Sequence, residues 1–145
     1  MRPITALLHA PGRIASLVSS AQARVNTEKM RIESELQATD AEVRAHEHAH
    51  VAALGKGVIS YDTVIGPDGR SYAVGGGVPV DLAPVPGDPE ATLRKAKAAI
   101  QAAYAVSEPS GADLNVAAEA YQLEIAAQHE IDRQKEAGGP QHWWA

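Results

Sequence analysis

The sequence predicts an α+β domain in which helix predominates, and three observations lead to this fold class. Residues 13–54 contain neither proline nor glycine, which favours one long helical segment. Residues 58–82 alternate runs of β-branched residues with turn residues, which is typical of a β-hairpin. Residues 90–106 and 110–137 are rich in alanine and are separated by a proline, which indicates two further helices.

The composition sets the size and type of the core. The chain has 145 residues, of which 45% are hydrophobic and 21% charged, as expected for one small globular domain, here with an extended helical arm. Aromatic residues make up only 4% and phenylalanine is absent. We therefore expect a thin core of alanine, valine, leucine and isoleucine between helices that approach closely.

The first helix is expected over residues 13–54, with one apolar face and its charges elsewhere. Steps of three, four or seven residues connect the apolar positions Ile14, Val18, Ala21, Val25, Ile32, Leu36, Val43 and then His46 and His50. Gly55 and Gly57 are expected to end it. Thr39 and Glu42 have capping-box spacing, which leaves open a break that would give the histidines a short helix of their own.

The hairpin is expected from four short runs, which are Val58–Tyr61, Thr63–Ile65, Ser71–Val74 and Val78–Val80. Gly66–Gly69 contains proline and glycine at turn positions and predicts the reversal. Gly75–Gly77 is compatible with a bulge, with a close approach of backbone to a ligand or helix, or with a flexible loop. Residue types alone favour the loop slightly.

The C-terminal half begins with a rigid connector at Pro84–Pro89. Asp88 is expected to be the N-cap of the helix over 90–106, which is a structural reason for this acid. The next helix is expected to run from about Ser110 to Ala137. The tail, residues 138–145, ends with Trp143 and Trp144, and we expect it either to dock onto a partner or to fold back onto the helices.

The most informative motif is His46-Glu47-His48-Ala49-His50, which contains His-Glu-x-x-His within a helical segment. Residues four apart face the same side of a helix, so His46 and His50 can chelate one Zn²⁺ ion while Glu47 takes a proton from water. A chance match and a solvated turn that only tunes charge are the rival interpretations. The apolar face favours inward-pointing His46 and His50, and it places His48 at the surface.

The composition also narrows the possible metal ligands and the possible binding partners. Without cysteine, any metal must be held by histidine and carboxylate. The net charge of −5 and the pI near 5.6 argue against nucleic-acid binding. The short apolar run near the N-terminus is interrupted at Pro11 and Gly12, so we expect a cytoplasmic protein, and no stretch is apolar enough to span a bilayer.

Three blocks in this order carry a resemblance to a known family: Glu42–His50 (EVRAHEHAH), Gly66–Gly76 (GPDGRSYAVGG) and Pro84–Thr92 (PVPGDPEAT). Together they resemble the SprA-related family, whose members are described as bacterial metalloproteases, over roughly residues 40–118. The resemblance implies a zincin-like domain over residues 40–137, preceded by the helical arm at 1–39. It also implies that His46 and His50 bind zinc and that Glu47 acts as the base.

One position departs from the family pattern. The family follows its Gly-Gly with a glutamate, whereas this chain has Gly77 there. Glycine supplies no ligand, and Asp81 is the nearest remaining acid, so we name it as the third zinc ligand. Other sources of a third ligand also remain open, namely Asp62, Glu119, His129 or a water molecule.

The function expected from these residues is that of a zinc-dependent metallopeptidase, which hydrolyses peptide bonds of a peptide or protein substrate by a zinc-activated water. Tyr72 or Tyr61 would donate a hydrogen bond to the developing oxyanion, although packing within the hairpin also explains both. The alternative is a degenerate family member that acts as a structural component of a phage or envelope assembly. It would form a homo-oligomer or a larger complex through its N-terminal helix and its Trp143 and Trp144 tail.

Overall fold

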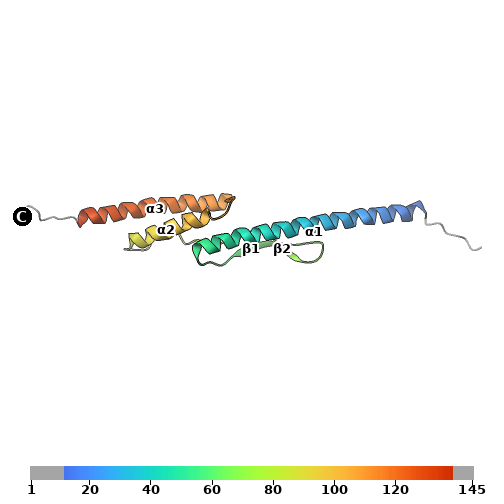
Figure 1. Cartoon of the computed structure of the whole chain (residues 1–145), viewed down its shortest axis with the longest axis horizontal. Helices are drawn as coiled ribbons and strands as arrows, with labels where there is room; N and C mark the ends of the chain where they lie inside the picture. Colours follow the sequence, from blue (N-terminus) through green and yellow to red (C-terminus); the bar gives the residue numbers. More distant parts are fainter. Residues whose placement is uncertain (1–11, 139–145) are drawn as a thin grey trace, which may run out of the picture.

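The computed structural model of the chain describes residues 12–138. Its elements are α1 (Arg13–Leu54), β1 (Ser60–Ile65), β2 (Ser71–Gly77), α2 (Pro89–Ala103) and α3 (Gly111–Ala137) (Figure 1). The described part is therefore a mostly helical α+β fold with one two-stranded antiparallel sheet, which confirms the predicted class. Trp143 and Trp144 lie outside the described residues.

Helix α1 is a single helix of 42 residues, so the break considered at Thr39 does not occur. The neighbouring Asp40 does not act as a cap. Its carboxylate accepts hydrogen bonds from Arg44 at 3.0 Å and from the backbone N–H of Ala73 at 2.8 Å, which fastens the hairpin to the helix. The helix ends at Gly55, whose φ of +72° lies in the left-handed region that glycine adopts without strain.

The hairpin pairs Ser60 with Gly77 at its open end and Ile65 with Ser71 at its turn. A register irregularity after Asp62 leaves one additional residue on β2. The glycine run belongs to strand β2, so the slightly favoured loop interpretation is wrong, and residues 78–80 are not a strand. Strand β2 packs against α1, whereas β1 forms the outer edge.

Helices α2 and α3 pack against each other through alanines. Helix α2 begins at the Asp88 N-cap, whose side chain accepts a hydrogen bond from Ala91 N at 2.9 Å, and it ends at Ala103 instead of near Val106. The buried apolar side chains of the two helices are Ala96, Ala99, Ala102, Ala103, Ala117, Ala120, Ala127 and Ile131. The core is thin, as the composition predicts.

The molecule is elongated, because α1 and α3 extend in opposite directions from a central junction (Figure 1). Helix α1 packs on β2 and α2, and its backbone does not pack against that of α3. The C-terminal end of α1 nevertheless lies near the N-terminal end of α3, and the candidate site is at this junction. Among residues 12–138, none of the helices combines the length and the apolar character that crossing a bilayer requires.

Candidate metal centre

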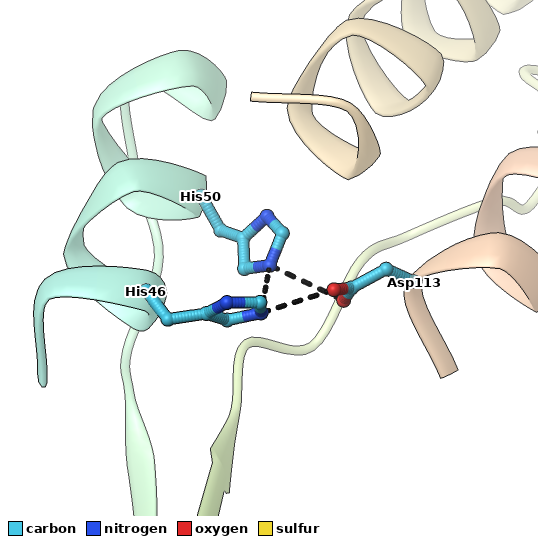
Figure 2. A group of neighbouring side chains, drawn as sticks. All are labelled: His46, His50 and Asp113. Atoms are coloured by element: carbon cyan, nitrogen blue, oxygen red, sulfur yellow. Dashed lines mark hydrogen bonds and ion pairs between the residues drawn. The ribbon is translucent and has the colours of Figure 1, made fainter. Parts of the chain in front are cut away.

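His46 and His50 lie one turn apart on α1 and face the junction. Their rings meet edge to face with centroids 4.7 Å apart, and their Nε2 atoms are 3.0 Å from each other (Figure 2). His50 is buried, His46 is half-buried with 27% of its side chain exposed, and His48 is exposed. The predicted inward direction of His46 and His50 and the surface position of His48 are confirmed.

Asp113 faces both histidines from the first turn of α3. Its Oδ2 lies 3.0 Å from His46 Nε2, and its Oδ1 lies 3.2 Å from His50 Nε2. The three side chains offer ligand atoms that all lie within 4.8 Å of one another. The sequence interpretation missed Asp113 because its spacing from Ser110 is that of a helix cap, which already explains an acid at this position.

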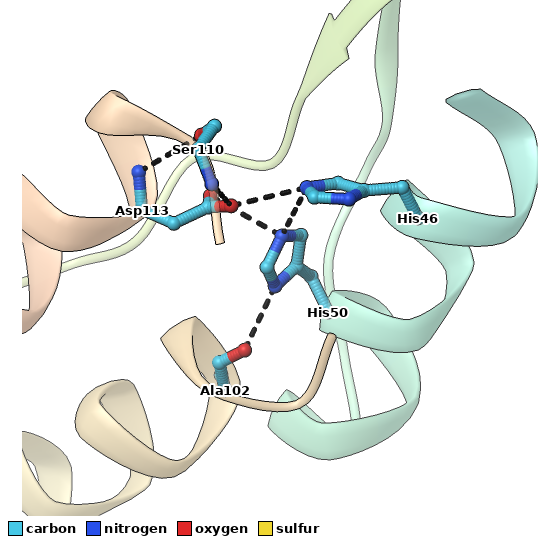
Figure 3. Close-up of polar contacts among 5 residues, drawn as sticks. All are labelled: His46, His50, Ala102, Ser110 and Asp113. Atoms are coloured by element: carbon cyan, nitrogen blue, oxygen red, sulfur yellow. Dashed lines mark hydrogen bonds and ion pairs between the residues drawn. The ribbon is translucent and has the colours of Figure 1, made fainter. Parts of the chain in front are cut away.

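Backbone and cap contacts fix the orientation of this group (Figure 3). His50 Nδ1 lies 2.8 Å from the carbonyl oxygen of Ala102, which can only accept, so Nδ1 carries the proton and Nε2 is free to bind a metal. The backbone N–H of Ser110 donates to Asp113 Oδ2 at 2.8 Å. Ser110 Oγ in turn accepts from the backbone N–H of Asp113 at 3.1 Å, which completes a capping box.

The Asp113 carboxyl is held in its charged form. Partial burial disfavours the charge, but the hydrogen bonds from Ser110 and the nearby His50 and His46 rings outweigh that effect and lower the pKa of Asp113. A carboxylate must be ionised to bind a metal. The surroundings of Asp113 therefore prepare it for that role.

The donor set and its spacing fit Zn²⁺. Two imidazole nitrogens and one carboxylate oxygen are a frequent protein ligand set of catalytic zinc, which keeps a fourth position for water or substrate. Ligand atoms at about 2.0–2.1 Å from a tetrahedral ion lie about 3.3 Å from each other. The two Nε2 atoms are 3.0 Å apart, and each lies close to a different Asp113 oxygen, Oδ2 at 3.0 Å from His46 and Oδ1 at 3.2 Å from His50. With a single carboxylate oxygen as the ligand atom, the three atoms lie within 4.8 Å of one another.

Glu47 follows His46 on α1 and is only 6% exposed. Together with His46, Asp113 and Gly77, it lines a cavity of about 380 Å³. Within the described part of the chain, Glu47 makes no hydrogen bond and no ion pair. The residue is buried as a whole, but its carboxylate oxygens are not among the buried atoms without a partner, so they are accessible from the cavity.

The Glu47 side chain is packed against the β2 backbone at Gly76. A Cβ atom at position 76 would lie 2.9 Å from Glu47 Cγ and 3.0 Å from the carbonyl oxygen of Ser60. Only glycine fits at this distance. The close-approach interpretation of the glycine run therefore holds at Gly76, whereas a Cβ at Gly77 would meet nothing within 4 Å.

The structure does not bring Asp81 to the histidines. Its carboxylate accepts hydrogen bonds from Lys95 Nζ at 2.8 Å and from the backbone N–H of Ala83 at 2.9 Å, and its side chain is 71% exposed. The nearby lysine holds the carboxylate at the surface beside α2. Asp113 occupies the position for which we named Asp81 as ligand.

Tyr72 lies at the turn of the hairpin and not among the residues that line the cavity. Its hydroxyl donates a hydrogen bond to Asp68, and this bond, together with burial, raises the pKa of Tyr72. Tyr61 packs beneath the Arg44 guanidinium, 4.7 Å from the ring centre, and its hydroxyl is buried without a partner in the described region. The contact of Tyr72 with Asp68 agrees with packing within the hairpin, whereas Tyr61 packs against α1.

The other three acceptors considered from the sequence are exposed and lie outside the group. These are Asp62, Glu119 and His129.

Comparison with known proteins supports the family assignment. The sequence model of the SprA-related family matches residues 15–142, which is most of the chain. No curated protein and no solved structure gives a match.

Proposed function

We propose that this chain, which belongs to the SprA-related family, is a zinc-dependent peptidase with a zincin-like site. One observation carries the proposal. Asp113 of α3 converges on His46 and His50 of α1, although 67 residues separate Asp113 from His46.

In this proposal His46, His50 and Asp113 hold the metal ion. The Ala102 carbonyl orients the His50 ring, and Ser110 orients the Asp113 carboxylate, so two of the three ligands are preorganised. Bound zinc would supply Lewis acidity, which polarises a peptide carbonyl and makes water more acidic. The missing family glutamate at Gly77 is then not needed as a ligand, since Asp113 provides the carboxylate.

Glu47 is the proposed general base. It lines the same cavity as His46 and Asp113, and no other described group competes for its carboxylate. It would accept the proton of the attacking water and pass it to the departing amine. Its burial strengthens these electrostatic interactions, because the surroundings are less polar than water.

The glycine-rich part of the cavity lining favours an extended substrate. Gly75, Gly76 and Gly77 line the cavity with backbone and carry no side chains that would fill it. An extended peptide can approach such a backbone closely. This feature supports a peptide bond as the target, and we propose no catalytic role for Tyr72, which lies elsewhere.

The test is hydrolysis of a library of quenched fluorescent peptides by the zinc-loaded chain and by Glu47→Gln. The substitution removes the base and leaves the three candidate ligands unchanged. We expect zinc content to stay the same and hydrolysis to fall by about a hundredfold or more. Glu119→Gln, on the exposed face of α3, is the matched control and should behave like the unmodified chain. Equal hydrolysis by Glu47→Gln would contradict the proposed role.

One outcome would favour the alternative of a degenerate, structural family member. Without metal, the contacts of Asp113 with His46 and His50 still connect α3 to α1. If the chain binds zinc but hydrolyses no peptide, or binds no zinc, this group has a structural role only. The proposal that the chain is a peptidase would then be wrong.

A further inference from the structure

The first 19 residues of α1, Arg13–Arg31, form a solvent-exposed arm. The arm extends beyond the hairpin (Figure 1). Every residue in it is exposed. Its large apolar side chains and their exposed fractions are Ile14 76%, Leu17 64%, Val18 61%, Val25 48% and Met30 69%.

The arm has an apolar face with cations beside it. Ile14, Val18 and Val25 are four and seven residues apart, so they share one face of the helix. Arg24 and Arg31 are also seven residues apart and lie along one side of this face. Lys29, four residues after Val25, lies along its other side.

The charge of the N-terminal region is opposite to that of the rest of the chain. Residues 1–31 carry five basic residues and a single acidic one, Glu28. The remaining residues carry eight basic and seventeen acidic residues, so residues 1–31 have a net charge of +4 and the rest of the chain −9. A basic helix with an apolar face is complementary to a surface whose outer layer is anionic and whose interior is apolar.

We propose that the arm binds the surface of an anionic lipid bilayer. Ile14, Val18 and Val25 enter the boundary between headgroups and acyl chains. Arg24 and Lys29 extend along the sides of the helix, with their charges at the level of the phosphates. The helix lies in the plane of the surface and does not cross it. This binding is independent of the metal centre.

A second copy of the arm fits this face less well. In a parallel pair with Ile14, Val18 and Val25 in the seam, Glu28 would also fall in the seam. The same pairing would bring Arg24 of one copy beside Lys29 of the partner, where like charges repel. The like-charge contact does not arise at a lipid surface, where cations beside an apolar face are favoured. Glu28 lies on the same face in both arrangements and is paired with Arg31.

The experiment measures co-sedimentation of the full chain with vesicles of phosphatidylcholine alone and with about 30% phosphatidylserine. We expect binding to the anionic vesicles only, weakened by salt. The charge variant is Arg13→Gln with Arg24→Gln and Lys29→Gln, and it should bind about tenfold to a hundredfold less tightly. The apolar variant Val18→Gln with Val25→Gln should also lose binding.

The matched control removes three exposed cations from α2 and α3 through Arg94→Gln, Lys97→Gln and Lys135→Gln. It changes the net charge equally and should bind like the unmodified chain. Equal binding by the control and the charge variant, or no binding to anionic vesicles, would overturn the proposal. Sedimentation equilibrium run alongside tests the second copy, and a dimer that dissociates in the apolar variant while vesicles stay unbound would assign the arm to self-association.

Discussion

His46 Nε2 lies 3.0 Å from Asp113 Oδ2, and this contact joins the C-terminal end of α1 to the N-terminal end of α3. The two helices have no direct backbone packing. Any ion that binds His46, His50 and Asp113 therefore also bridges two halves whose helices and strands, within residues 12–138, are otherwise connected only by the packing of α2 against α1 and α3. Metal binding and stability should be linked.

The first prediction follows from this link. A ligand that binds only the folded chain at a free concentration 100 times its Kd stabilises it by about 2.7 kcal/mol. For a chain of this length, zinc should then raise Tm by about 5–10 °C. Differential scanning calorimetry with zinc and with a chelator measures the shift. The shift should vanish in Asp113→Asn, and an equal shift in this variant would contradict the link.

The second prediction concerns the cap that positions Asp113. Ser110→Ala removes the hydroxyl that accepts from Asp113 N, which should cost about 1 kcal/mol of stability and also weaken zinc binding. Asp88→Ala is the matched control, because it removes the N-cap of α2 at a similar cost but touches no candidate ligand. Urea denaturation and zinc titration of both variants separate the two effects. Equal zinc affinity in both would show that Ser110 acts only as a cap.

The third prediction compares two neighbouring glycines. At Gly76 a methyl group would collide with Glu47 and with the Ser60 carbonyl, so Gly76→Ala should destabilise the fold by about 1–3 kcal/mol and reduce hydrolysis. At Gly77 a methyl group meets nothing within 4 Å, so Gly77→Ala should be neutral or stabilise the fold by up to about 1 kcal/mol. Denaturation curves of the pair provide the comparison. The structure would be wrong at this strand if the order were reversed.

The fourth prediction is a pH dependence at the contact between α1 and the hairpin. The hydrogen bond from Ala73 N, with further help from Arg44, lowers the pKa of Asp40 below its ordinary value despite the opposing effect of burial. A lowered folded-state pKa means that the stabilisation is complete above the unfolded pKa of about 3.9 and is lost as pH falls through the folded value. The stability difference between the unmodified chain and Asp40→Asn should therefore shrink below about pH 4. Denaturation at several pH values checks this, and a constant difference would exclude the role of Asp40.

Much of the fold could be predicted because its causes are local. Helix α1 occupies the segment free of proline and glycine, and it ends at the glycine expected to end it. Asp88 caps α2 as its position before Pro89 indicates. The Gly75–Gly77 run could not be assigned in this way. The run is a strand because it pairs with Ser60–Asp62 of β1, and Gly76 also packs against Glu47 of α1. No local pattern contains these contacts.

The site was predictable only in part for the same reason. The spacing of His46 and His50 fixes their common face, since one helical turn separates them. Asp113 comes from a helix that the sequence places far away, and its cap function hides it. Asp81 is the acid nearest to Gly77 in the sequence, but Lys95, 14 residues later, holds it at the surface.

The most direct test of the account is the zinc content of the purified full chain, measured by elemental mass spectrometry beside Asp113→Ala and Asp81→Ala. The account predicts about one zinc per chain in the unmodified protein and in Asp81→Ala, and loss of zinc in Asp113→Ala. Absence of zinc from the unmodified chain after supplementation would contradict it. Zinc retained in Asp113→Ala but lost in Asp81→Ala would contradict it equally.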